Sequence, residues 1–381
     1  MVLVSIIITL LYLFLIGSFA FGIDKVSIFK LEDLASKTPF SIIIPFRNEA
    51  EHLPALLKSI EKLNYPKHLF EIVFVDDASE DNSSEIIQKI LDKKPSKENA
   101  TQTNISVIKN ERKTNSPKKD AITLAIKRVK HEWIITTDAD CELPKFWLDV
   151  FDEYIQKTNA KCIVAPVTYK PANTFLNRFQ LLDLLSLQGA TIGGFGIKKP
   201  FLCNGANFGY QKKLFEALNG FDGNSNIASG DDIFLLEKIV KNDSESLHYL
   251  KCEHAIVKTQ SESTWKNLIS QRLRWAAKTT AYNNTFGKLT GFIVLLMNAL
   301  VIITGLLTII TNFNFKICLY ILFIKLNIDF FLIYKTATFF NQKEVLKSFI
   351  FSFFLYPFFS VYIAFCSTFK NYKWKGRTFK K

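Results

Sequence analysis

The chain has 381 residues, of which 48% are hydrophobic and 22% charged, and its formal net charge is +13 at pH 7. The length is sufficient for one large soluble domain or two small ones, but the hydrophobic content is high for a purely soluble protein. Lysine and arginine are scattered, with a cluster only in the tail 369–381, which is typical of a membrane-surface flank and argues against a nucleic-acid partner.

The amino-terminal segment 2–23 carries no charge and is long enough to cross the hydrocarbon core of a bilayer. A signal peptide is the alternative interpretation. Because a basic leader region and a small-residue cleavage site are both missing, the sequence favours an uncleaved transmembrane anchor over residues 1–23.

The residues from 38 to 284 are polar overall and alternate apolar strands with amphipathic helices. Strands are predicted at 40–46, 70–77, 105–110 and 133–138, and helices at 50–63, 83–93 and 118–129. Continuous apolar strands separated by helices predict an α/β fold with a doubly wound, mostly parallel sheet. The lysine- and asparagine-rich segment 92–104 has no periodicity and is predicted to be a solvated loop.

Polar side chains follow three of these strands. They are Arg47, Asn48 and Glu49 after the first, Asp76 and Asp77 after the second, and Asp138 and Asp140 after the fourth. Ligands of such sheets bind outside the carboxyl ends of the strands, so the sequence predicts one shared site. No GxGxxG follows the first strand, and a dinucleotide is therefore not indicated.

The segment 133–144 (WIITTDADCELP) places Asp138, Asp140 and Glu142 on alternate positions. Crowded carboxylates are suited to a hard divalent cation, Mg²⁺ or Mn²⁺, which shares its oxygen ligands with phosphates. Glu142 lies near Pro144 and is interpreted as structural, at a helix amino terminus.

The carboxyl-terminal membrane region, 289–368, contains three apolar segments at 289–310, 317–334 and 349–366. The second is interrupted by Lys325 and Asp329, which could pair at their i,i+4 spacing. The third contains Pro357, where a kink is expected.

Six segments resemble, in their order, the motifs of family 2 glycosyltransferases of the GT-A fold. They are SIIIPFRNEAEHLPALLKSI, VFVDDASEDNS, TTDADCELP, NGANFGYQKKLFEALNGFDG, SGDDIFLLEKI and QRLRW. The resemblance covers Pro39 to Trp275. Within the family, the chain is similar in particular to the membrane-integrated branch that includes cellulose, chitin, hyaluronan and poly-N-acetylglucosamine synthases. It implies transfer of a sugar from a nucleotide sugar, with a UDP-sugar favoured.

For the donor, the resemblance implies a nucleotide pocket formed by Pro45, Arg47, Glu49 and Asp77. It also implies a lysine that contacts the nucleotide and follows a glycine in the family motif. In this sequence Pro117 stands in place of that glycine, so either Lys118 or Lys119 could be the lysine that reaches the nucleotide. Asp138 and Asp140 match the D-x-D motif as donor and metal ligands, with Asp140 the stronger candidate for the metal.

For the acceptor and the chemistry, the resemblance implies that Asn207 lies beside the acceptor. Asp232 would be the general base, with Asp231 in place of a glutamate, and a base opposite the leaving diphosphate gives inversion and a β-linkage. Capping of a helix by Ser229 or Asp231 would explain only one of the acids.

The resemblance further implies that Gln271, Arg274 and Trp275 bind the diphosphate and acceptor sugar. From the residues alone, 261–278 reads as a basic amphipathic helix on the membrane surface. The segment 174–190 is interpreted as an interfacial helix, with core packing as the alternative.

Because nucleotide sugars are cytosolic, the catalytic body is expected in the cytoplasm, on an inner or plasma membrane whose lipids are partners. Three carboxyl-terminal spans would place the six basic residues of the tail outside, against the positive-inside bias. The charges favour two full crossings, with 317–334 the first candidate not to cross, and the side of the tail stays open.

The sequence thus predicts a membrane-bound inverting glycosyltransferase acting on a saccharide or glycolipid. Two alternatives are a lipid-linked acceptor used without processive synthesis, and a membrane protein that binds nucleotide sugars without turnover. The few spans argue against a translocation channel, and the two acid pairs argue against a binding-only protein.

Overall fold

The structure is a computed structural model that describes residues 2–92, 104–171, 173–278, 281–311, 313–369, 372–374 and 377–379. Nearly all of the loop predicted at 92–104, and part of the basic tail, lie outside these residues. The chain divides into two compact units, which are described separately. The sheet unit comprises Ser27–Thr168 and Cys203–Gln260, and the helical unit comprises Met1–Val26, Tyr169–Leu202 and Ser261–Lys381.

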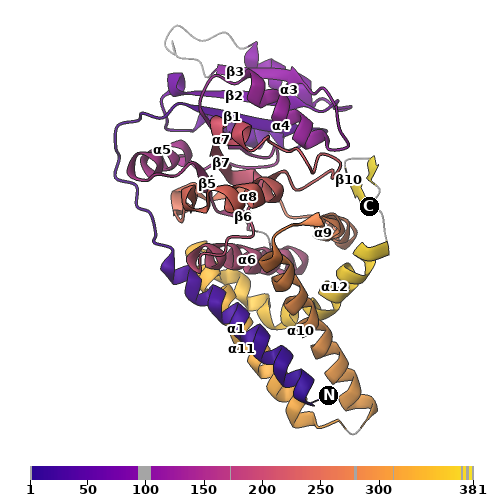
Figure 1. The fold of residues 1–381 in the computed structure, drawn as a ribbon. Coiled ribbons are helices and arrows are strands. Elements are labelled where there is room, and N and C mark those ends of the chain that lie inside the picture. Colours follow the sequence, from indigo (N-terminus) through magenta and orange to yellow (C-terminus); the bar gives the residue numbers. More distant parts are fainter. Residues whose placement is uncertain are drawn as a thin grey trace. The chain divides into compact units, whose positions relative to one another are not determined.

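A seven-stranded sheet with the order β3-β2-β1-β4-β7-β5-β8 forms the centre of the sheet unit (Figure 1). Its strands are β1 (Phe40–Phe46), β2 (Phe70–Asp76), β3 (Asn104–Lys109), β4 (Trp133–Thr136), β5 (Cys162–Val164), β7 (Phe208–Gln211) and β8 (Leu247–Tyr249). β7 runs antiparallel to both neighbours, and all other pairs are parallel. The predicted mostly parallel α/β sheet is confirmed.

Helices cover both faces of this sheet. The helices are α2 (Leu53–Glu61), α3 (Ser83–Leu91), α4 (Pro117–Arg128), α5 (Trp147–Lys157), α7 (Lys212–Ala217) and α8 (Asp231–Asn242). Phe40, Ile42 and Ile44 share a buried core with residues of α2, α3 and α5. The intervening Ile43 is also fully buried, on the opposite face, and α4 packs against β1 and β2.

The remaining elements of the sheet unit are short. They are β6 (Val167–Tyr169), which pairs with β9 (Val257–Thr259), and the 3₁₀ turns η1 (Lys67–Leu69), η2 (Gly205–Asn207), η3 (Ser244–Ser246) and η4 (Glu253–Ala255).

Pro45 occurs in the central strand β1 without loss of a ladder hydrogen bond. The carbonyl of Ile43 accepts from the N–H of Thr137, so Ile43 and Pro45, two residues on, face the same neighbouring strand. β4 ends opposite Ile43, and the missing N–H of Pro45 therefore lies beyond its last pair. The carboxyl end of β1 is free to turn away at Arg47.

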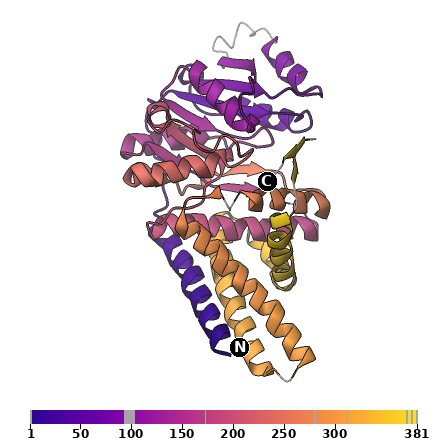
Figure 2. The same cartoon turned by 45° about the vertical axis from the view of Figure 1, so that its right-hand side comes forward.

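Among its described residues the helical unit contains four helices that are long and apolar enough to cross a membrane. They are α1 (Val2–Lys25), α10 (Thr285–Ile310), α11 (Phe315–Phe339) and the continuous η6 and α12 (Lys343–Ser348, Phe349–Phe369). α1, α10 and α11 contact one another and run side by side (Figure 2). The unit also holds α6 (Phe175–Gly196), α9 (Trp265–Ala277) and the hairpin β10 (Tyr372–Trp374) and β11 (Arg377–Phe379).

α1 and α6 cross at glycines. A Cβ added to Gly193 would lie 2.4 Å from the carbonyl oxygen of Phe19, and one added to Gly196 would lie 1.8 Å from that of Gly22. No side chain fits at such distances, so the two backbones are in direct contact.

The predicted pairing inside the apolar segment 317–334 is confirmed. Lys325 Nζ lies 2.5 Å from Asp329 Oδ2, and the hydroxyl of Tyr12 on α1 donates to Asp329 Oδ1 at 2.5 Å. Lys325 is 1% exposed. A charge pair with a third hydrogen-bonding partner is the arrangement that polar groups need in an apolar environment.

Candidate functional site

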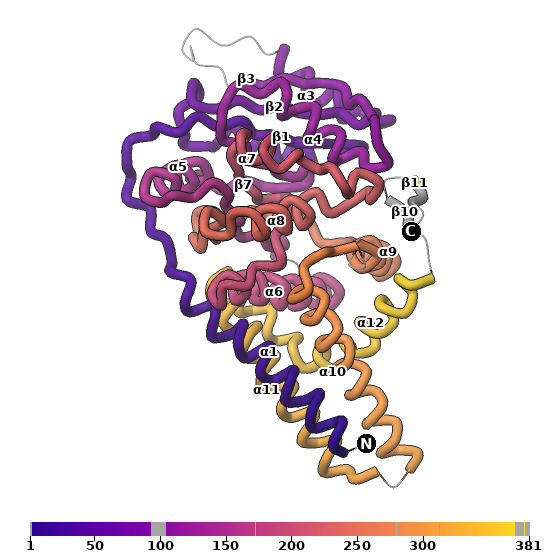
Figure 3. Tube along the Cα trace, viewed as in Figure 1, coloured from indigo at the N-terminus to yellow at the C-terminus, as the bar shows by residue number. Residues whose placement is uncertain are grey.

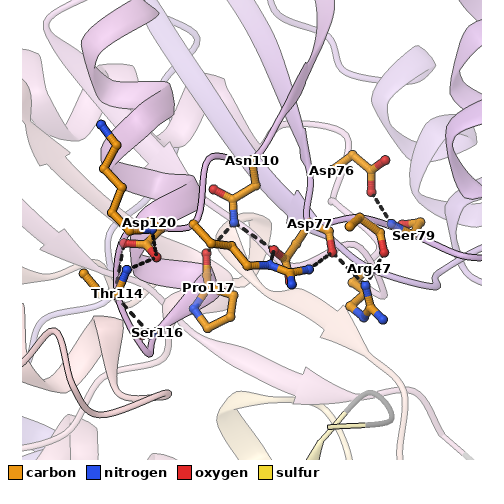
Figure 4. Close-up of polar contacts among 12 residues, drawn as sticks. Arg47, Asp76, Asp77, Ser79, Asn110, Thr114, Ser116, Pro117 and Asp120 are labelled. Atoms are coloured by element: carbon orange, nitrogen blue, oxygen red, sulfur yellow. Dashed lines mark hydrogen bonds and ion pairs between the residues drawn. The ribbon is translucent and has the colours of Figure 1, made fainter.

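The loop after β2 is shaped by an acid and an arginine (Figure 4). Asp76 accepts from the backbone N–H of Ser79 at 2.8 Å and from Ser84 Oγ at 2.9 Å. Arg47, at the end of β1, is buried and donates to the carbonyls of Asp77 and Ala78. Its other guanidinium nitrogen lies 2.7 Å from Glu80. In this structure the side chain of Arg47 therefore holds the loop in place.

Asp77 is buried and is oriented by two side chains. Its Oδ1 accepts from Arg112 Nε at 2.6 Å and from Asn110 Nδ2 at 2.9 Å (Figure 4). Asn110 also donates to the carbonyl of Pro117, which connects Asp77 to the start of α4. The sequence reasoning missed Arg112 and Asn110, because no recognised motif includes the residues after the third strand.

The remaining residues of the predicted nucleotide loop lie beside this group. Pro45 is half-buried near the end of β1, and Glu49 begins the turn into α2, with its N–H donating to Ser83 Oγ at 2.8 Å. Both are within the sheet unit, at the same carboxyl edge of β1 as Arg47.

Three carboxylates gather around Lys118 in the first turn of α4. Its Nζ lies 2.7 Å from Asp138 Oδ1 and 3.2 Å from Asp231 Oδ2. Burial opposes the charge, but Asp138, Asp231 and Asp232 outweigh it and raise the pKa of Lys118 above its ordinary value. Lys118 is thus the lysine in the acid cluster, while Lys119 is directed to a different loop.

Asp231 and Asp232 begin α8 after Gly230, which has a positive φ of 83°. The N-cap position is occupied by Gly230, rather than by Ser229 or Asp231. Asp232 accepts from the N–H of Gly205 at 3.0 Å and of Ile233 at 2.8 Å.

Gly205 is a residue of this cluster that the sequence reasoning missed. A Cβ at this position would lie 3.0 Å from Asp231 Oδ2, 3.4 Å from Lys118 Nζ and 3.5 Å from the Cβ of Asp232. Its carbonyl accepts from Thr136 Oγ1 at 2.9 Å, which fixes it to the end of β4. The motif NGANFGY pointed to this segment, but only the packing shows that its glycine contacts the acids.

Asn207, the predicted acceptor contact, is fully buried. Its Oδ1 accepts from Trp147 Nε1 at 2.9 Å, and its Nδ2 donates to the carbonyls of Pro166 and Ala255, each at 2.8 Å. The whole amide is therefore used in holding α5, η4 and the residues before β6 together. A contact between Asn207 and the acceptor stays a prediction.

Asp140 Oδ2 accepts from Thr259 Oγ1 at 3.0 Å, and Asp138 is the partner of Lys118. Among the described residues no group of three or more His, Cys, Asp or Glu could hold a metal ion. Two carboxylates are nevertheless sufficient for Mg²⁺ when the phosphates of a substrate supply further ligands. Ser116 and Ser229, two residues before Lys118 and Asp231, have buried hydroxyls without a hydrogen-bond partner in the described part of the chain. The residues fit a metal shared with a polar ligand.

Glu142 does not lie at a helix amino terminus, and its structural role stays a prediction, but its backbone bonds to β9. Its backbone N–H donates to the carbonyl of Lys258 at 2.7 Å in an isolated bridge, whereas α5 begins only at Trp147. The bridge holds the segment after Asp140 against β9, which also contributes Thr259.

The QRLRW segment belongs to the helical unit, on α9. Gln271 donates to Glu262 Oε1 at 2.9 Å, and Arg274 and Trp275 are both half-buried. Arg272, which the sequence reasoning passed over, lies with its guanidinium 4.1 Å from the centre of the Trp275 ring. Its Nε donates to Asp183 Oδ2 of α6 at 2.7 Å, in a pair with both side chains 6% exposed. Arg272 therefore fixes α9 to α6 and supports Trp275.

Comparison with protein families gives two matches. The family described as "Glycosyl transferase family 2" matches residues 41–218, and "Glycosyl transferase family group 2" matches residues 133–365, which is more than half of the chain. Together they cover residues 41–365, which include all the candidate site residues described above.

Comparison with single proteins gives partial matches. The poly(ribitol-phosphate) β-N-acetylglucosaminyltransferase TarS of Staphylococcus aureus is 32% identical over 26% of this chain and 16% of its own length. The undecaprenyl-phosphate 4-deoxy-4-formamido-L-arabinose transferase of Pseudomonas savastanoi is 37% identical over 27% of this chain and 28% of its own. The matched segments thus span less than a third of these two relatives.

Among solved structures, the mannosyltransferase PcManGT of Pyrobaculum calidifontis, in complex with GDP-mannose and Mn²⁺, has a TM-score of 0.57 at 14% identity, over 93% of this chain and 98% of its own. That likeness supports the fold. The branch of cellulose, chitin and hyaluronan synthases is not named by these matches and stays a prediction. The chain belongs to the family 2 glycosyltransferases, with a GT-A fold.

Proposed function

We propose that the protein is a membrane-bound, inverting glycosyltransferase that uses a nucleotide sugar, in the first instance a UDP-sugar, and forms a β-linkage. The observation that carries the proposal is the acid cluster, in which Lys118, Asp138, Asp231, Asp232 and Gly205 meet at the carboxyl ends of the strands. A binding-only protein has no need for a second pair of carboxylates at this place.

The nucleotide part of the donor is assigned to the loops after β1, β2 and β3. Asp77, held by Arg112 and Asn110, presents an acceptor beside a donor, a pairing suited to the edge of a nucleobase or to a ribose hydroxyl. Arg47 and Glu49 shape the loop, and Pro45 lines its start.

The diphosphate is assigned to Lys118 and to the D-x-D motif. Asp138 and Asp140 would hold Mg²⁺ or Mn²⁺, which would neutralise negative charge on the leaving diphosphate. Lys118, charged at any pH of interest, adds a second positive group at the same place. Gln271, Arg274 and Trp275 are proposed as further contacts for the diphosphate and the acceptor sugar.

Asp232 is the proposed general base. Asp231 is 7% exposed and paired with Lys118, whereas Asp232 is half-buried and is held by two backbone N–H groups. Asp232 takes the proton from the acceptor hydroxyl as the oxygen attacks the anomeric carbon. The bond to the nucleoside diphosphate breaks on the opposite face, which inverts the configuration.

The acceptor is proposed to be a saccharide or a lipid-linked saccharide at the cytoplasmic face. The names of two relatives specify poly(ribitol-phosphate) and undecaprenyl-phosphate, which favours an acceptor attached to a phosphorylated polymer or lipid. The four apolar helices support the membrane location.

The test is a screen of the full-length protein in membranes with labelled UDP-glucose, UDP-galactose and their N-acetyl forms, with Mg²⁺ or Mn²⁺. Asp232→Asn should lower transfer by about 10²–10⁴-fold while donor binding is nearly unchanged. The matched control is Asp243→Asn, at the other end of α8 and paired only with an exposed lysine among its ion pairs, which should keep activity. Donor binding without turnover by the wild type would support the sensor alternative, and loss of binding in Asp232→Asn would contradict the base assignment.

A further inference from the structure

The first inference concerns the path of α12 through the helical unit. The beginning of α12 lies at α6, where Arg178 Nε donates to Ser348 Oγ at 2.7 Å and η6 packs on α6. Just before it, Gln342 donates to the carbonyl of Tyr169 at 2.9 Å. The helix therefore starts beside the amino-terminal half of α6.

The end of α12 lies in the same layer. The strand β10, three residues after α12, packs on α9. α9 is joined to α6 by the pair Arg272–Asp183 and by the ring contact between Phe179 and Trp265, whose centroids are 5.3 Å apart. Both ends of α12 are thus near the layer formed by α6 and α9.

The middle of α12 leaves this layer and returns. Its first half follows α11 in the opposite direction, since Phe349 lies 5.2 Å from Phe330 and Phe353 contacts Lys325. Beyond Pro357, Phe359 lies 5.2 Å from Phe179 of α6. In Figure 3 the second half of α12 runs back toward α9. Pro357, which lies inside the helix, is a sufficient cause of the bend.

The other three apolar helices each have only one end at this layer. Gly22 of α1 contacts α6, Thr336 of α11 would meet a Cβ on Gly189, and Asn284 before α10 donates to the carbonyl of Pro200. The opposite ends are the start of α1 and the turn between α10 and α11. α11 contains two charged residues, Lys325 and Asp329, but their ion pair allows the helix to cross the bilayer.

We infer that the chain crosses the bilayer three times, with α1, α10 and α11, and that α12 is a re-entrant helix, so that the basic hairpin lies on the membrane surface at the side of α9. The inference rests on the proposed membrane location. It removes the conflict with the positive-inside bias, because Lys373 and Arg377 of the hairpin then share a side with Lys343 and Lys347. The segment that does not cross is α12, rather than 317–334 as the sequence suggested.

The test is labelling of single cysteines with a membrane-impermeant maleimide, in intact cells and in inverted vesicles. The background replaces Cys203, the only half-buried cysteine, the other five being buried. Lys266→Cys on α9 and Lys316→Cys at the start of α11 are exposed controls for the two sides, and a cysteine is added after Lys381. The added cysteine should label with Lys266→Cys. Labelling with Lys316→Cys would overturn the re-entrant path, whereas release of the protein by alkaline carbonate would instead refute the membrane location.

A second inference comes from Lys119, which is 2% exposed. Its ammonium group donates to the carbonyls of Asn224 at 2.7 Å and Ile227 at 3.0 Å, and it lies 4.6 Å from the centre of the Phe234 ring. Asn224 and Ile227 are the ends of one turn, closed by the N–H of Ile227 on the carbonyl of Asn224 at 3.2 Å. A single buried charge thus holds this turn against α8.

This turn comes immediately before the acid pair. Only Ala228, Ser229 and Gly230 separate it from Asp231. The beginning of the same segment is held separately, since Lys238 donates to the carbonyls of Leu218 at 3.1 Å and Gly220 at 2.7 Å. The segment between α7 and α8 is therefore fixed at two points by two lysines of similar geometry.

The geometry points to Lys119 as a positioning residue for Asp231 and Asp232 in the proposed transfer reaction. Lys118 and Lys119 are neighbours in the first turn of α4, so the group that pairs with Asp231 and the group that holds its preceding turn move as one body. Loss of Lys119 removes the ammonium donor from the carbonyl of Ile227 and leaves that of Asn224 with only the N–H of Ile227, which loosens the turn.

The test compares Lys119→Met with Lys238→Met, which removes the same kind of clamp farther from the acids. Lys119→Met should lower kcat by about tenfold or more, with a small change in the KM for the donor, and should speed amide hydrogen exchange at Ile227. Lys238→Met should speed exchange near Gly220 and leave kcat within about twofold. Lys119→Arg, which keeps a charged donor, should lose less than Lys119→Met in both readouts.

Unchanged exchange at Ile227, or a kcat loss equal to that of Lys238→Met, would overturn the role of Lys119. If the wild type transfers no sugar, the proposed function fails, yet the exchange measurement still decides whether Lys119 holds the turn. If Lys119→Met does not fold, the test uses Lys119→Arg. Because arginine retains a charged donor, the amide of Ile227 should then stay protected from hydrogen exchange.

Discussion

The two units each contain a lysine paired with aspartate, and the two pairs are built differently. In the helical unit the side chains of Lys325 and Asp329 are 2% and 14% exposed, and the third partner, Tyr12, comes from a neighbouring helix. In the sheet unit Lys118 and Asp138 are 19% and 37% exposed, and Lys118 is shared with Asp231. The first pair is closed to solvent, and the second is open.

The two clusters differ in solvent exposure and in net charge, and these two properties indicate different roles. A closed pair in an apolar environment has to satisfy itself, and it stabilises the packing that encloses it. An open cluster with three carboxylates around one lysine carries excess negative charge, which is suited to a cation and a phosphorylated ligand. Substitutions should therefore separate stability from activity.

Lys325→Met is expected to have the largest effect. It leaves the half-buried Asp329 without its cation in an apolar environment, which should lower the free energy of unfolding by about 3–5 kcal/mol, while the activity per folded molecule is unchanged. Thermal unfolding in detergent measures the first and transfer by the folded fraction the second. The double variant Lys325→Met with Asp329→Leu should recover most of the stability, and a double variant as unstable as the single one would contradict the closed-pair interpretation.

Lys118→Met should lower the affinity for the donor more than it lowers the stability, in contrast to Lys325→Met. Loss of a charged hydrogen-bond donor of about 1.5–3 kcal/mol corresponds to donor affinity weaker by about ten- to a hundredfold, with a smaller fall in Tm than for Lys325→Met. Titration with the UDP-sugar checks this. Unchanged affinity together with a large fall in Tm would make Lys118 a structural lysine like Lys325.

Gly205→Ala tests how closely the cluster is packed. The new methyl group would lie 3.0 Å from Asp231 Oδ2, and a displacement of the acids by a few tenths of an ångström should lower kcat by about tenfold. Gly291→Ala in α10, where a Cβ meets nothing within 4 Å, is the matched control and should behave as the wild type. Equal activity of the two variants would show that the acids tolerate the shift.

The smallest effect is that of pH on Lys118. The raised pKa means that its stabilising contribution is fully present below the unfolded lysine pKa of about 10.4 and is lost only as pH rises through the still higher folded value. The ratio of donor affinities of wild type and Lys118→Met should therefore be constant between about pH 6 and 9. A ratio that falls toward pH 9 would mean that Lys118 loses its proton there and is not held by the carboxylates.

Local pattern was sufficient for the first four strands, for the helices between them and for the family. The apolar run Phe40–Phe46 is β1 residue for residue, and the strand ends brought Asp77, Asp138 and Asp140 to one edge, because parallel strands place their carboxyl ends together. The apolar helices were likewise visible as strongly hydrophobic segments of sufficient length.

What the sequence could not decide depends on contacts between distant segments. Which of two adjacent lysines enters the acid cluster, that Gly205 rather than Asn207 contacts it, and that Arg112 orients Asp77 are set by packing across tens of residues. The path of α12 is of the same kind. Hydrophobicity gives the length of an apolar helix. Only its neighbours decide whether its two ends lie on the same side of the membrane or on opposite sides, because a re-entrant helix and a crossing helix bury their apolar side chains equally well.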